Sequence, residues 1–401
     1  MVRNPVTDLR GASRMVVDAI TGITGLVEAM HTSIAKRPTR LAGAMVGGAV
    51  NGTTSVVYES IRGVTRVVGR GIDLTLGAAA PALGHVESSP TRESIVAALN
   101  GVLGDHLALT GNPLAVTMHL CREGRPLELT REGLAAGIQA PSSKVLVLVH
   151  GLCQDDRCWE RNGHDHGAEL ARDLCYTTVY LRYNTGLHIS TNGHTFARML
   201  EALVAAWPVP LKEVSILAHS MGGLVARSAH HYASAANHAW ARKLRKLVFL
   251  GTPHHGTPLE RAGHRVDLLL GKTPYTAPFT LLGKVRSAGI TDLRHGYVLE
   301  EDWKGHDRFA NRADLRCPLP LPKSVKCYAI AAAIGRAPTP RRDQLIGDGL
   351  VPVPSALGEH RDSRLQLVFP RSHQWTARAT SHFGLLGPGP VYERIRGWFD
   401  G

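Results

Sequence analysis

The sequence lacks several features that would assign it to a class at once. Its 401 residues contain no long low-complexity tract, only six cysteines and only 5% aromatic residues. None of the cysteines forms a C-x-x-C pair, which excludes common zinc and redox motifs and predicts reduced thiols. The first residues, MVRNPVTDLR, have no apolar core of the kind that secretory signals carry. We therefore predict a cytoplasmic globular protein, which a disulfide between the neighbouring Cys153 and Cys158 would contradict.

Basic residues outnumber acidic residues in the sequence. The formal net charge is +13, and such a basic balance favours anionic partners. Neither zinc-finger spacing nor an aromatic-interleaved RNA motif accompanies it, so we predict no nucleic-acid partner. The uncharged stretch Leu41–Tyr58 is just long enough to cross a bilayer, but its glycines and polar residues argue against insertion.

Residues 1–110 are predicted to form a helical region. Two apolar stripes at helical spacing indicate paired helices, and a basic face accompanies the second of them. Residues 1–70 carry nine Lys or Arg and four Asp or Glu. The basic face could lie on an anionic membrane, but we favour helices packed on the main domain, because the apolar stripes need a partner. The first stripe is Val16, Ile20, Ile23, Val27 and Met30, the second is Val57, Ile61, Val64 and Val68, and the basic face is Arg62, Arg66 and Arg70.

Residues 111–401 are predicted to form an α/β domain with a mostly parallel sheet and helices on both faces. Near-continuous Val, Leu and Ile runs alternate with helical stretches, which is typical of βαβ units. An antiparallel pair, Leu114–Leu120 and Leu127–Thr130, leads the sheet. Residues 258–324 form a long connection that we interpret as a lid or cap rather than a peripheral addition. The other predicted strands are Lys144–Val149, Thr177–Tyr183, Glu213–Ala218, Lys246–Leu250, Val325–Ile330 and Leu365–Phe369.

The sharpest motif joins the strand Glu213–Ala218 to a helical stretch. The sequence Ala218-His219-Ser220-Met221-Gly222-Gly223 has the small-x-Ser-x-Gly pattern of a nucleophile elbow. The turn is so tight that its flanking positions admit only small side chains, and it exposes the serine at a helix N-terminus. We therefore predict Ser220 as a nucleophile rather than an ordinary turn residue.

A second motif supplies an oxyanion hole. The strand Lys144–Val149 ends in His150-Gly151-Leu152, a usual source of one backbone donor. Backbone N–H groups aimed at the negative oxygen of a tetrahedral intermediate stabilise it. We predict the N–H groups of Leu152 and Met221 as the two donors and interpret His150 as structural.

An acid and a base should follow the last strands. Asp343, Asp348 and Asp362 are candidate acids, and we select Asp348 because Gly347 and Gly349 place it in a tight turn. His373 and His382 are candidate bases, and we select His382, which lies just before the terminal helical stretch. The order Ser, Asp, His is the one that nucleophile-elbow proteins use.

These motifs resemble the esterase/lipase branch of the α/β-hydrolase superfamily, near the bacterial proteins similar to GPI-inositol deacylases. The resemblance covers residues 113–401 and implies an α/β-hydrolase fold without cofactor or metal. It is carried by Val149–Leu152, Ala218–Gly223, Leu250–Gly256, Gly347–Pro352 and Ser381–Leu386.

The segment Gly251–Gly256 follows a strand beside the nucleophile strand, so we expect it to line the substrate pocket. The predicted substrate-binding residues are His219, Thr252, Pro253 and His254. A metal site made from His254 or His255 with His164 and His166 is the alternative, but nothing in the sequence fixes their spacing in space.

The sequence thus predicts a serine hydrolase that cleaves carboxylic esters of small molecules or lipids through an acyl-enzyme. Two alternatives stay open: an acyltransferase or amidase on the same triad, and a membrane-surface or scaffold protein with a vestigial hydrolase domain. The complete set of triad and oxyanion residues disfavours the second. Contact with an anionic membrane stays open, and the sequence does not reveal the oligomeric state.

Overall fold

The computed structural model describes residues 2–3, 7–18, 86–87, 89–257, 286–308 and 314–401. The chain divides into two compact units, residues 1–89 with 109–115, and residues 90–108 with 116–401. In the first unit residues 7–18 are helical, and β1 (Val2–Arg3) pairs antiparallel with β2 (Val86–Glu87). Apart from Val16, the predicted N-terminal stripes, their basic face and Leu41–Tyr58 lie outside the described residues.

An eight-stranded sheet forms the centre of the second unit, in the order β10-β9-β8-β7-β5-β6-β3-β4. The first six of these strands are parallel, whereas β3 is antiparallel to both β6 and β4. This arrangement confirms the predicted fold class. The strands are β3 (His119–Arg122), β4 (Arg125–Pro126), β5 (Lys144–Val149), β6 (Thr177–Arg182), β7 (Glu213–His219), β8 (Leu244–Leu250), β9 (Lys326–Ala333) and β10 (Gln374–Arg378).

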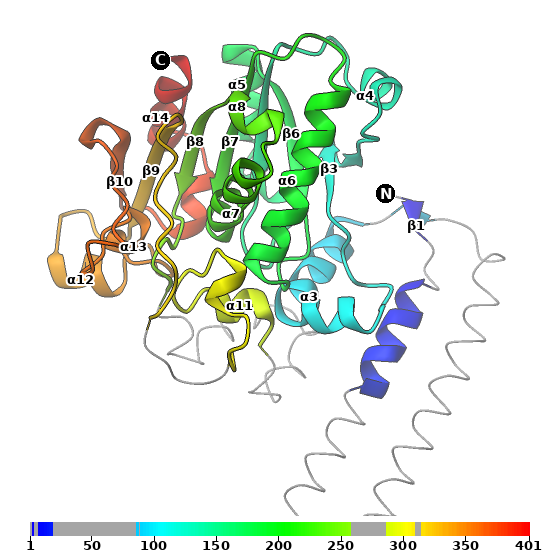
Figure 1. Ribbon diagram of the computed structural model, residues 1–401, viewed down its shortest axis with the longest axis horizontal. Helices are drawn as coiled ribbons and strands as arrows, with labels where there is room; N and C mark the ends of the chain where they lie inside the picture. The colour runs from blue at the N-terminus through cyan, green and yellow to red at the C-terminus, as the bar shows by residue number, and fades with distance from the viewer. Residues whose placement is uncertain (1, 4–6, 19–85, 88, 258–285, 309–313) are drawn as a thin grey trace, which may run out of the picture. The chain divides into compact units, whose positions relative to one another are not determined.

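Helices cover both faces of this sheet (Figure 1). The α-helices of the second unit are α3 (Pro90–Leu109), α4 (Arg131–Gly137), α5 (His166–Leu174), α6 (Ile189–Ala206), α7 (Met221–Ala235), α8 (Ala239–Lys243), α11 (Ala288–Asp292), α12 (Pro340–Leu345), α13 (Val353–Ala356) and α14 (Pro390–Asp400). Four short 3₁₀-helices accompany them in the described residues: η2 (Asp156–Trp159), η4 (Glu300–Asp302), η5 (Arg371–His373) and η6 (His382–Leu386).

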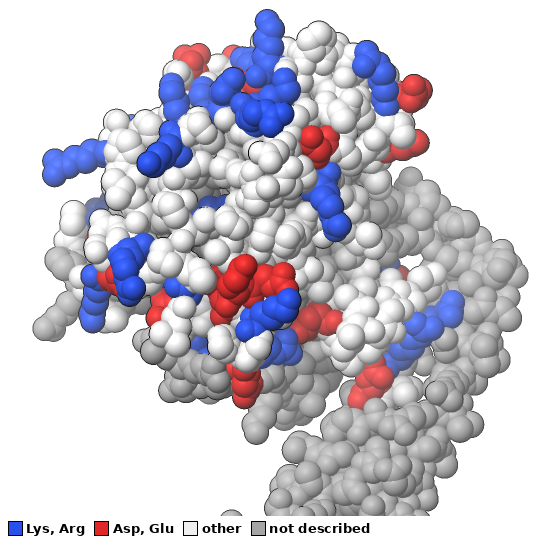
Figure 2. Space-filling view, viewed as in Figure 1, with Lys and Arg blue, Asp and Glu red and all other residues white. Residues whose placement is uncertain are grey.

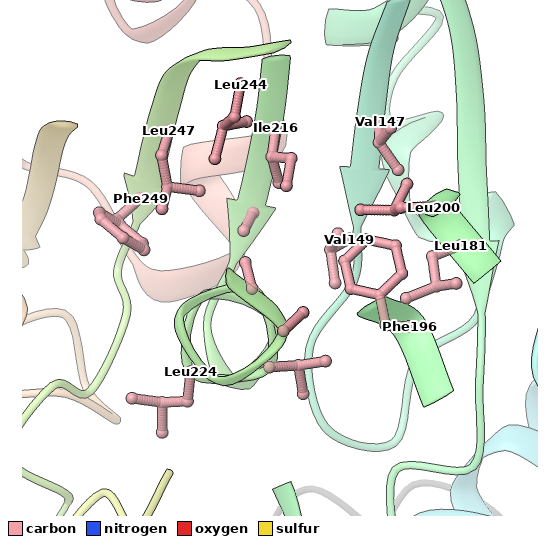
Figure 3. Packing of buried hydrophobic residues seen from close by; sticks show 14 of the residues in the cluster. Val147, Val149, Leu181, Phe196, Leu200, Ile216, Leu224, Leu244, Leu247 and Phe249 are labelled. Atoms are coloured by element: carbon pink, nitrogen blue, oxygen red, sulfur yellow. The ribbon is translucent and has the colours of Figure 1, made fainter. Parts of the chain in front are cut away.

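The central parallel strands are mainly apolar because both of their faces are buried. Successive side chains of a strand point to opposite faces. In β5, Val147 and Val149 join one core cluster with α6 and α7, whereas Leu146 and Leu148 join another with α5 and α14. Figure 3 shows the first cluster, with Phe196 of α6 beside the β5 valines and the other α6 and α7 residues packed against the sheet. This packing fixes the strand ends, and thereby the site that they carry.

The prediction of a strand at Leu365–Phe369 was wrong, and the last strand of the sheet along the chain is β10. The run alternates like a strand, since Leu367 and Phe369 are buried and Val368 is 79% exposed. However, β10 occupies the edge of β9, with Gln374 opposite Ala329. The apolar run instead fills the core as an irregular segment, and the Leu367 N–H donates to the Gly358 carbonyl at 2.8 Å.

The leading antiparallel pair is present but shorter than predicted. Its strands β3 and β4 replace the expected Leu114–Leu120 and Leu127–Thr130. The turn between them uses Glu123 at φ 51° and Gly124 at φ 70°, a left-handed pair that closes a tight hairpin.

Part of the predicted lid is described and is packed firmly on the domain. The Ser287 hydroxyl donates to the Gly101 carbonyl of α3 at 2.6 Å. The Trp303 indole stacks on His188 at 3.6 Å and donates to the Ser190 hydroxyl at the start of α6. Residues 286–308 therefore belong to the body of the domain. Residues 258–285 and 309–313, on which a lid would depend, lie outside the described residues.

A buried charge cluster ties α3 to the loop that follows β5. Arg182, at the end of β6, contacts Glu93 of α3 at 2.5 Å. It also contacts Asp155 at 3.3 Å and Asp156 at 2.5 Å. Breaking a buried pair leaves an uncompensated charge, so this cluster holds η2 and the preceding turn in place.

The face of the described chain that Figure 2 shows is mixed in charge. Figure 2 shows basic side chains gathered at the upper edge of the view, where the strands of Figure 1 begin, and acidic and basic side chains lying together near the lower edge. Across the described ranges, none of the helices combines the length and apolar character that crossing a bilayer requires.

Candidate active site

Ser220 lies at the carboxyl end of the sheet, between the last residue of β7 and the first of α7. Its backbone has φ 54° and ψ −129°, a strained conformation for a residue other than glycine. Its N–H donates to the Leu250 carbonyl of β8 at 2.8 Å. A Cβ on Gly222 would lie 2.4 Å from the Val149 carbonyl oxygen, so α7 can approach β5 only with glycine there. The strained turn is therefore held by close packing.

Asp348 and His382 form a buried hydrogen-bonded pair. The His382 Nδ1 lies 2.7 Å from the Asp348 Oδ2, and the two residues are 4% and 2% exposed. The other oxygen, Oδ1, accepts the N–H groups of Leu350 and Val351 at 2.9 and 2.8 Å. The His382 N–H also donates to the Asp348 carbonyl at 3.1 Å. Both oxygens of the carboxylate are thus fixed by donors, which aims it at the imidazole.

Gly251 connects this pair to the Ser220 turn. It follows Leu250, the residue that accepts the Ser220 N–H, and has φ 57°. A Cβ built on Gly251 would lie 3.1 Å from the Nδ1 and Cε1 atoms of His382. The His382 ring therefore lies against the backbone at the end of β8, beside the turn that holds Ser220.

The other candidate acids and bases have different partners. Asp343 forms an ion pair with Arg378 at 2.7 Å, and Asp362 forms one with Arg364 at 2.7 Å. His373 precedes β10, and its Nδ1 lies 3.0 Å from the Cys327 carbonyl near the start of β9. His373 therefore lies at the amino end of the parallel strands, whereas Ser220 lies at their carboxyl end.

The turn after β5 carries Leu152, one of the two predicted oxyanion donors. The Gly151 N–H donates to the Gln154 Oε1 at 3.0 Å. A Cβ on Gly151 would lie 2.8 Å from the Ser220 Cβ, which places this turn directly against the elbow. Met221, the other predicted donor, opens α7, where N–H groups have no acceptor within the helix.

His150 is structural in its surroundings, as the sequence indicated. Its ring stacks on Tyr183 at 4.4 Å, and its Nδ1 lies 2.9 Å from the Gly151 carbonyl. Complete burial lowers the pKa of His150 to about 4, so it is neutral at physiological pH.

The predicted substrate-binding residues lie beneath the site. His219, Thr252 and His254 have no exposed surface, and Pro253 is also buried. His254 packs edge-on against Phe249 at 4.7 Å. The substrate contacts predicted for these four residues therefore remain a prediction, since in the described structure they support the site from below.

The histidines of the alternative metal site lie in two places. The His164 Nε2 lies 2.7 Å from the His166 Nδ1, whereas His255 packs against His360 with ring centroids 4.8 Å apart. In the ranges that the structure describes, no three His, Cys, Asp or Glu side chains are grouped as metal ligands. The six cysteines, all within those ranges, are unpaired.

Comparison with known proteins agrees with this architecture. Residues 169–317 match the model of a family described as "PGAP1-like alpha/beta domain". The match runs from α5 past β8 and includes Ser220. Over this segment the chain is similar to that family.

Several solved structures are similar to this chain at low identity. The mature lipase BlEst2 of Bacillus licheniformis is 17% identical, with 70% of this chain and 97% of that chain covered and a TM-score of 0.41. Lipase 1 of Pelosinus fermentans is 13% identical, with 64% and 98% covered and a TM-score of 0.42. Phospholipase PlaB of Legionella pneumophila is 14% identical, with 53% and 45% covered and a TM-score of 0.37. No curated protein matches the sequence.

Sequence reasoning missed Gln154 and the contact between Gly251 and His382. The one signal for Gln154 was its position three residues after Gly151. The contact of Gly251 joins residues more than a hundred positions apart, and no local pattern encodes it.

The protein is expected to lose stability in mild acid. Burial lowers the pKa values of both His150 and His166 to about 4. Above pH 6.5 both groups are neutral in the folded and unfolded chains, so they have no effect there. As the pH falls from 6.5 towards 4, only the unfolded chain takes up these protons, which costs about 2 kcal/mol of stability for each histidine at pH 5. Urea unfolding at pH 7.5 and pH 5 measures this loss, and equal midpoints would contradict it.

Substitution of Gly251 by alanine is expected to impair both stability and turnover. The positive φ costs about 1–2 kcal/mol for a residue with a Cβ, and the new methyl would press on the His382 ring. We expect kcat to fall at least about tenfold, because small displacements of a reacting group are costly. Gly163→Ala is the matched control, since Gly163 has φ 72° and no atom within 4 Å of its Cβ position. A kcat that falls equally in both variants would contradict the role of Gly251.

Proposed function

We propose that this protein is a serine hydrolase that cleaves carboxylic esters, with Ser220 as nucleophile, His382 as base and Asp348 as the orienting acid. One observation carries the proposal. The hydrogen-bonded pair of His382 and Asp348, 2.7 Å apart, lies at the carboxyl end of the sheet, where the strained Ser220 turn is also held. A nucleophile, a base and a group that orients the base are the parts that acyl transfer needs.

In the proposed mechanism, the Ser220 Oγ attacks the ester carbonyl carbon while the His382 Nε2 takes the hydroxyl proton. The carbonyl oxygen becomes negative, and the N–H groups of Leu152 and Met221 stabilise it. The intermediate collapses, the carbon–oxygen bond to the alcohol breaks, and His382 returns the proton to the leaving alcohol. Water then repeats the sequence on the acyl-enzyme and releases the acid and free Ser220.

Asp348 supports both half-reactions. Its Oδ2 accepts the Nδ1–H of His382, which leaves the Nε2 lone pair free to accept the serine proton. When His382 becomes an imidazolium, the carboxylate stabilises the positive charge. None of these steps requires a cofactor.

The substrate class and surroundings are further parts of the proposal. The apolar residues of the insertion 258–324 support a lid over an acyl pocket, with medium acyl chains preferred over acetyl. The basic N-terminal region, with Arg62, Arg66 and Arg70, supports peripheral contact of a cytoplasmic enzyme with anionic lipid. Small-molecule and lipid esters are both included.

Hydrolysis of p-nitrophenyl esters from C2 to C16 tests the proposal, with Ser220→Ala as the control. We expect turnover by the wild type, none above background by Ser220→Ala, and labelling of Ser220 alone by a fluorophosphonate. Faster transfer to an added alcohol than to water would indicate an acyltransferase, and cleavage of anilides over esters an amidase. A folded wild type that neither turns over nor takes the label would favour the vestigial-domain alternative.

A further inference from the structure

The residue before the nucleophile is placed between the base and the oxyanion turn. The His219 Nε2 lies 3.2 Å from the carbonyl oxygen of His382, and its Nδ1 lies 3.2 Å from the Gln154 Oε1. The same Oε1 accepts the Gly151 N–H at 3.0 Å, at the turn that carries Leu152. One buried side chain therefore touches the segments on both sides of Ser220.

We infer that His219 is a positioning residue that couples the backbone of the base to the oxyanion turn through Gln154. The inference rests on the proposed function and assigns this side chain a role other than substrate contact. Because His219 directly precedes Ser220, the nucleophile, the base and the oxyanion turn meet at one imidazole. Movement of any one of them would alter the contacts of the other two.

The surroundings of His219 keep its ring in one place and without charge. Trp159 lies edge-on to it with ring centroids 6.5 Å apart, and Phe383 lies at 6.3 Å. Burial and the neighbouring His382 lower the pKa of His219 well below its usual range. A neutral ring matters here because the His382 ring, 4.7 Å away, must itself accept a proton during turnover. A second positive charge so close would oppose that step.

The two contacts of His219 are not equivalent at any moment. Both facing atoms, the His382 carbonyl oxygen and the Gln154 Oε1, are acceptors. A neutral imidazole has one N–H, so it donates to one of them at a time. The Gln154 Oε1 keeps its bond from Gly151 in either case. Glutamine at position 219 would keep an N–H donor, whereas leucine would keep only the volume.

His166 provides a matched control, because it also contacts a backbone carbonyl of the short helix η6. Its Nε2 lies 2.8 Å from the carbonyl oxygen of Leu385, at the other end of the η6 helix that begins with His382. It is fully buried, as His219 is, but its other nitrogen contacts His164 and not the oxyanion turn. If His219 acted only by supporting η6, removal of His166 and removal of His219 would therefore lower kcat to a similar extent.

The test measures kcat, KM and the rate of fluorophosphonate inactivation of the full chain, with thermal melting as a check of folding. We expect His219→Leu to lower kcat about 100-fold, the size expected when a reacting group is misplaced, with KM within threefold of wild type. The kcat of His219→Gln should be at least tenfold higher than that of His219→Leu. Gln154→Met should lower kcat about tenfold, and the double variant should fall short of the product of the two effects, as for residues that act through one contact. His166→Leu should melt earlier but keep kcat within threefold.

Three results would overturn the inference: a folded His219→Leu with kcat within threefold of wild type, an equal loss in His166→Leu, or independent effects of the His219 and Gln154 changes. If His219→Leu does not fold, an unchanged kcat in Gln154→Met overturns it instead. A wild type that neither turns over esters nor takes the label would reject the proposed function, and the positioning role with it. A labelled, active wild type with a normal His219→Leu would reject the positioning role alone.

Discussion

Replacement of His382 by alanine is expected to lower kcat by about 10⁴- to 10⁶-fold, the range seen when a triad base is removed. The reason is that the imidazole held by Asp348 is the proposed acceptor for the Ser220 proton. Without it the serine hydroxyl is a weak nucleophile at neutral pH. The measurement is kcat for a p-nitrophenyl ester at saturating concentration, with circular dichroism to show that the variant is folded.

His373 provides the control for this experiment. It lies nine positions earlier. Its ring packs at a tilt against Tyr328 with ring centroids 4.1 Å apart, and its Nδ1 contacts the Cys327 carbonyl. His373→Ala should therefore cost about 1 kcal/mol of stability for the lost hydrogen bond and leave kcat within a few-fold. The opposite pattern, with His373→Ala inactive and His382→Ala active, would show that the base assignment is wrong.

The sequence predicted the central parallel strands well because burial on both faces leaves a strong local pattern. The predicted strand Lys144–Val149 coincides with β5, and β7 extends one residue beyond its predicted end. The strained turn at Ser220 was equally visible, since a turn that admits only small side chains restricts the residues near Ser220. Steric constraints of this kind act within a few residues, and the sequence records them directly.

The last strand shows where local pattern fails. Leu365–Phe369 alternates like a strand, yet hydrogen bonds to β9 decide which segment joins the sheet, and Gln374–Arg378 forms them. The error did not affect the choice of His382 as the proposed base, because His382 follows both the predicted strand and β10. His373 was a candidate base only because it follows the predicted strand.

The role of His219 could not have been read from the sequence. Its position beside Ser220 suggested substrate contact, but the His219 side chain has no exposed surface. Its partners, Gln154 and the carbonyl of His382, lie 65 and 163 positions away. Such contacts depend on the packing of the whole sheet and leave no periodic signal.

Asp348→Asn is expected to lower kcat by about 10⁴-fold, the size found when a triad aspartate becomes an amide, while the fold is preserved. The structure supplies the reason. The Asp348 Oδ1 accepts two N–H groups, from Leu350 and Val351. An asparagine must keep its oxygen in that position, because its NH₂ group there would face two donors.

The NH₂ group of the asparagine would then occupy the Oδ2 position and donate to the His382 Nδ1. A neutral His382 would consequently carry its proton on Nε2, the tautomer that cannot accept the proton of Ser220. Because the two side chains have nearly the same shape, stability should change little compared with the loss of activity. The checks are kcat across pH 6 to 9 and NMR of the imidazole nitrogens, where the variant should show the Nε2–H form. An Asp348→Asn variant with kcat within tenfold of wild type would mean that another group orients the base.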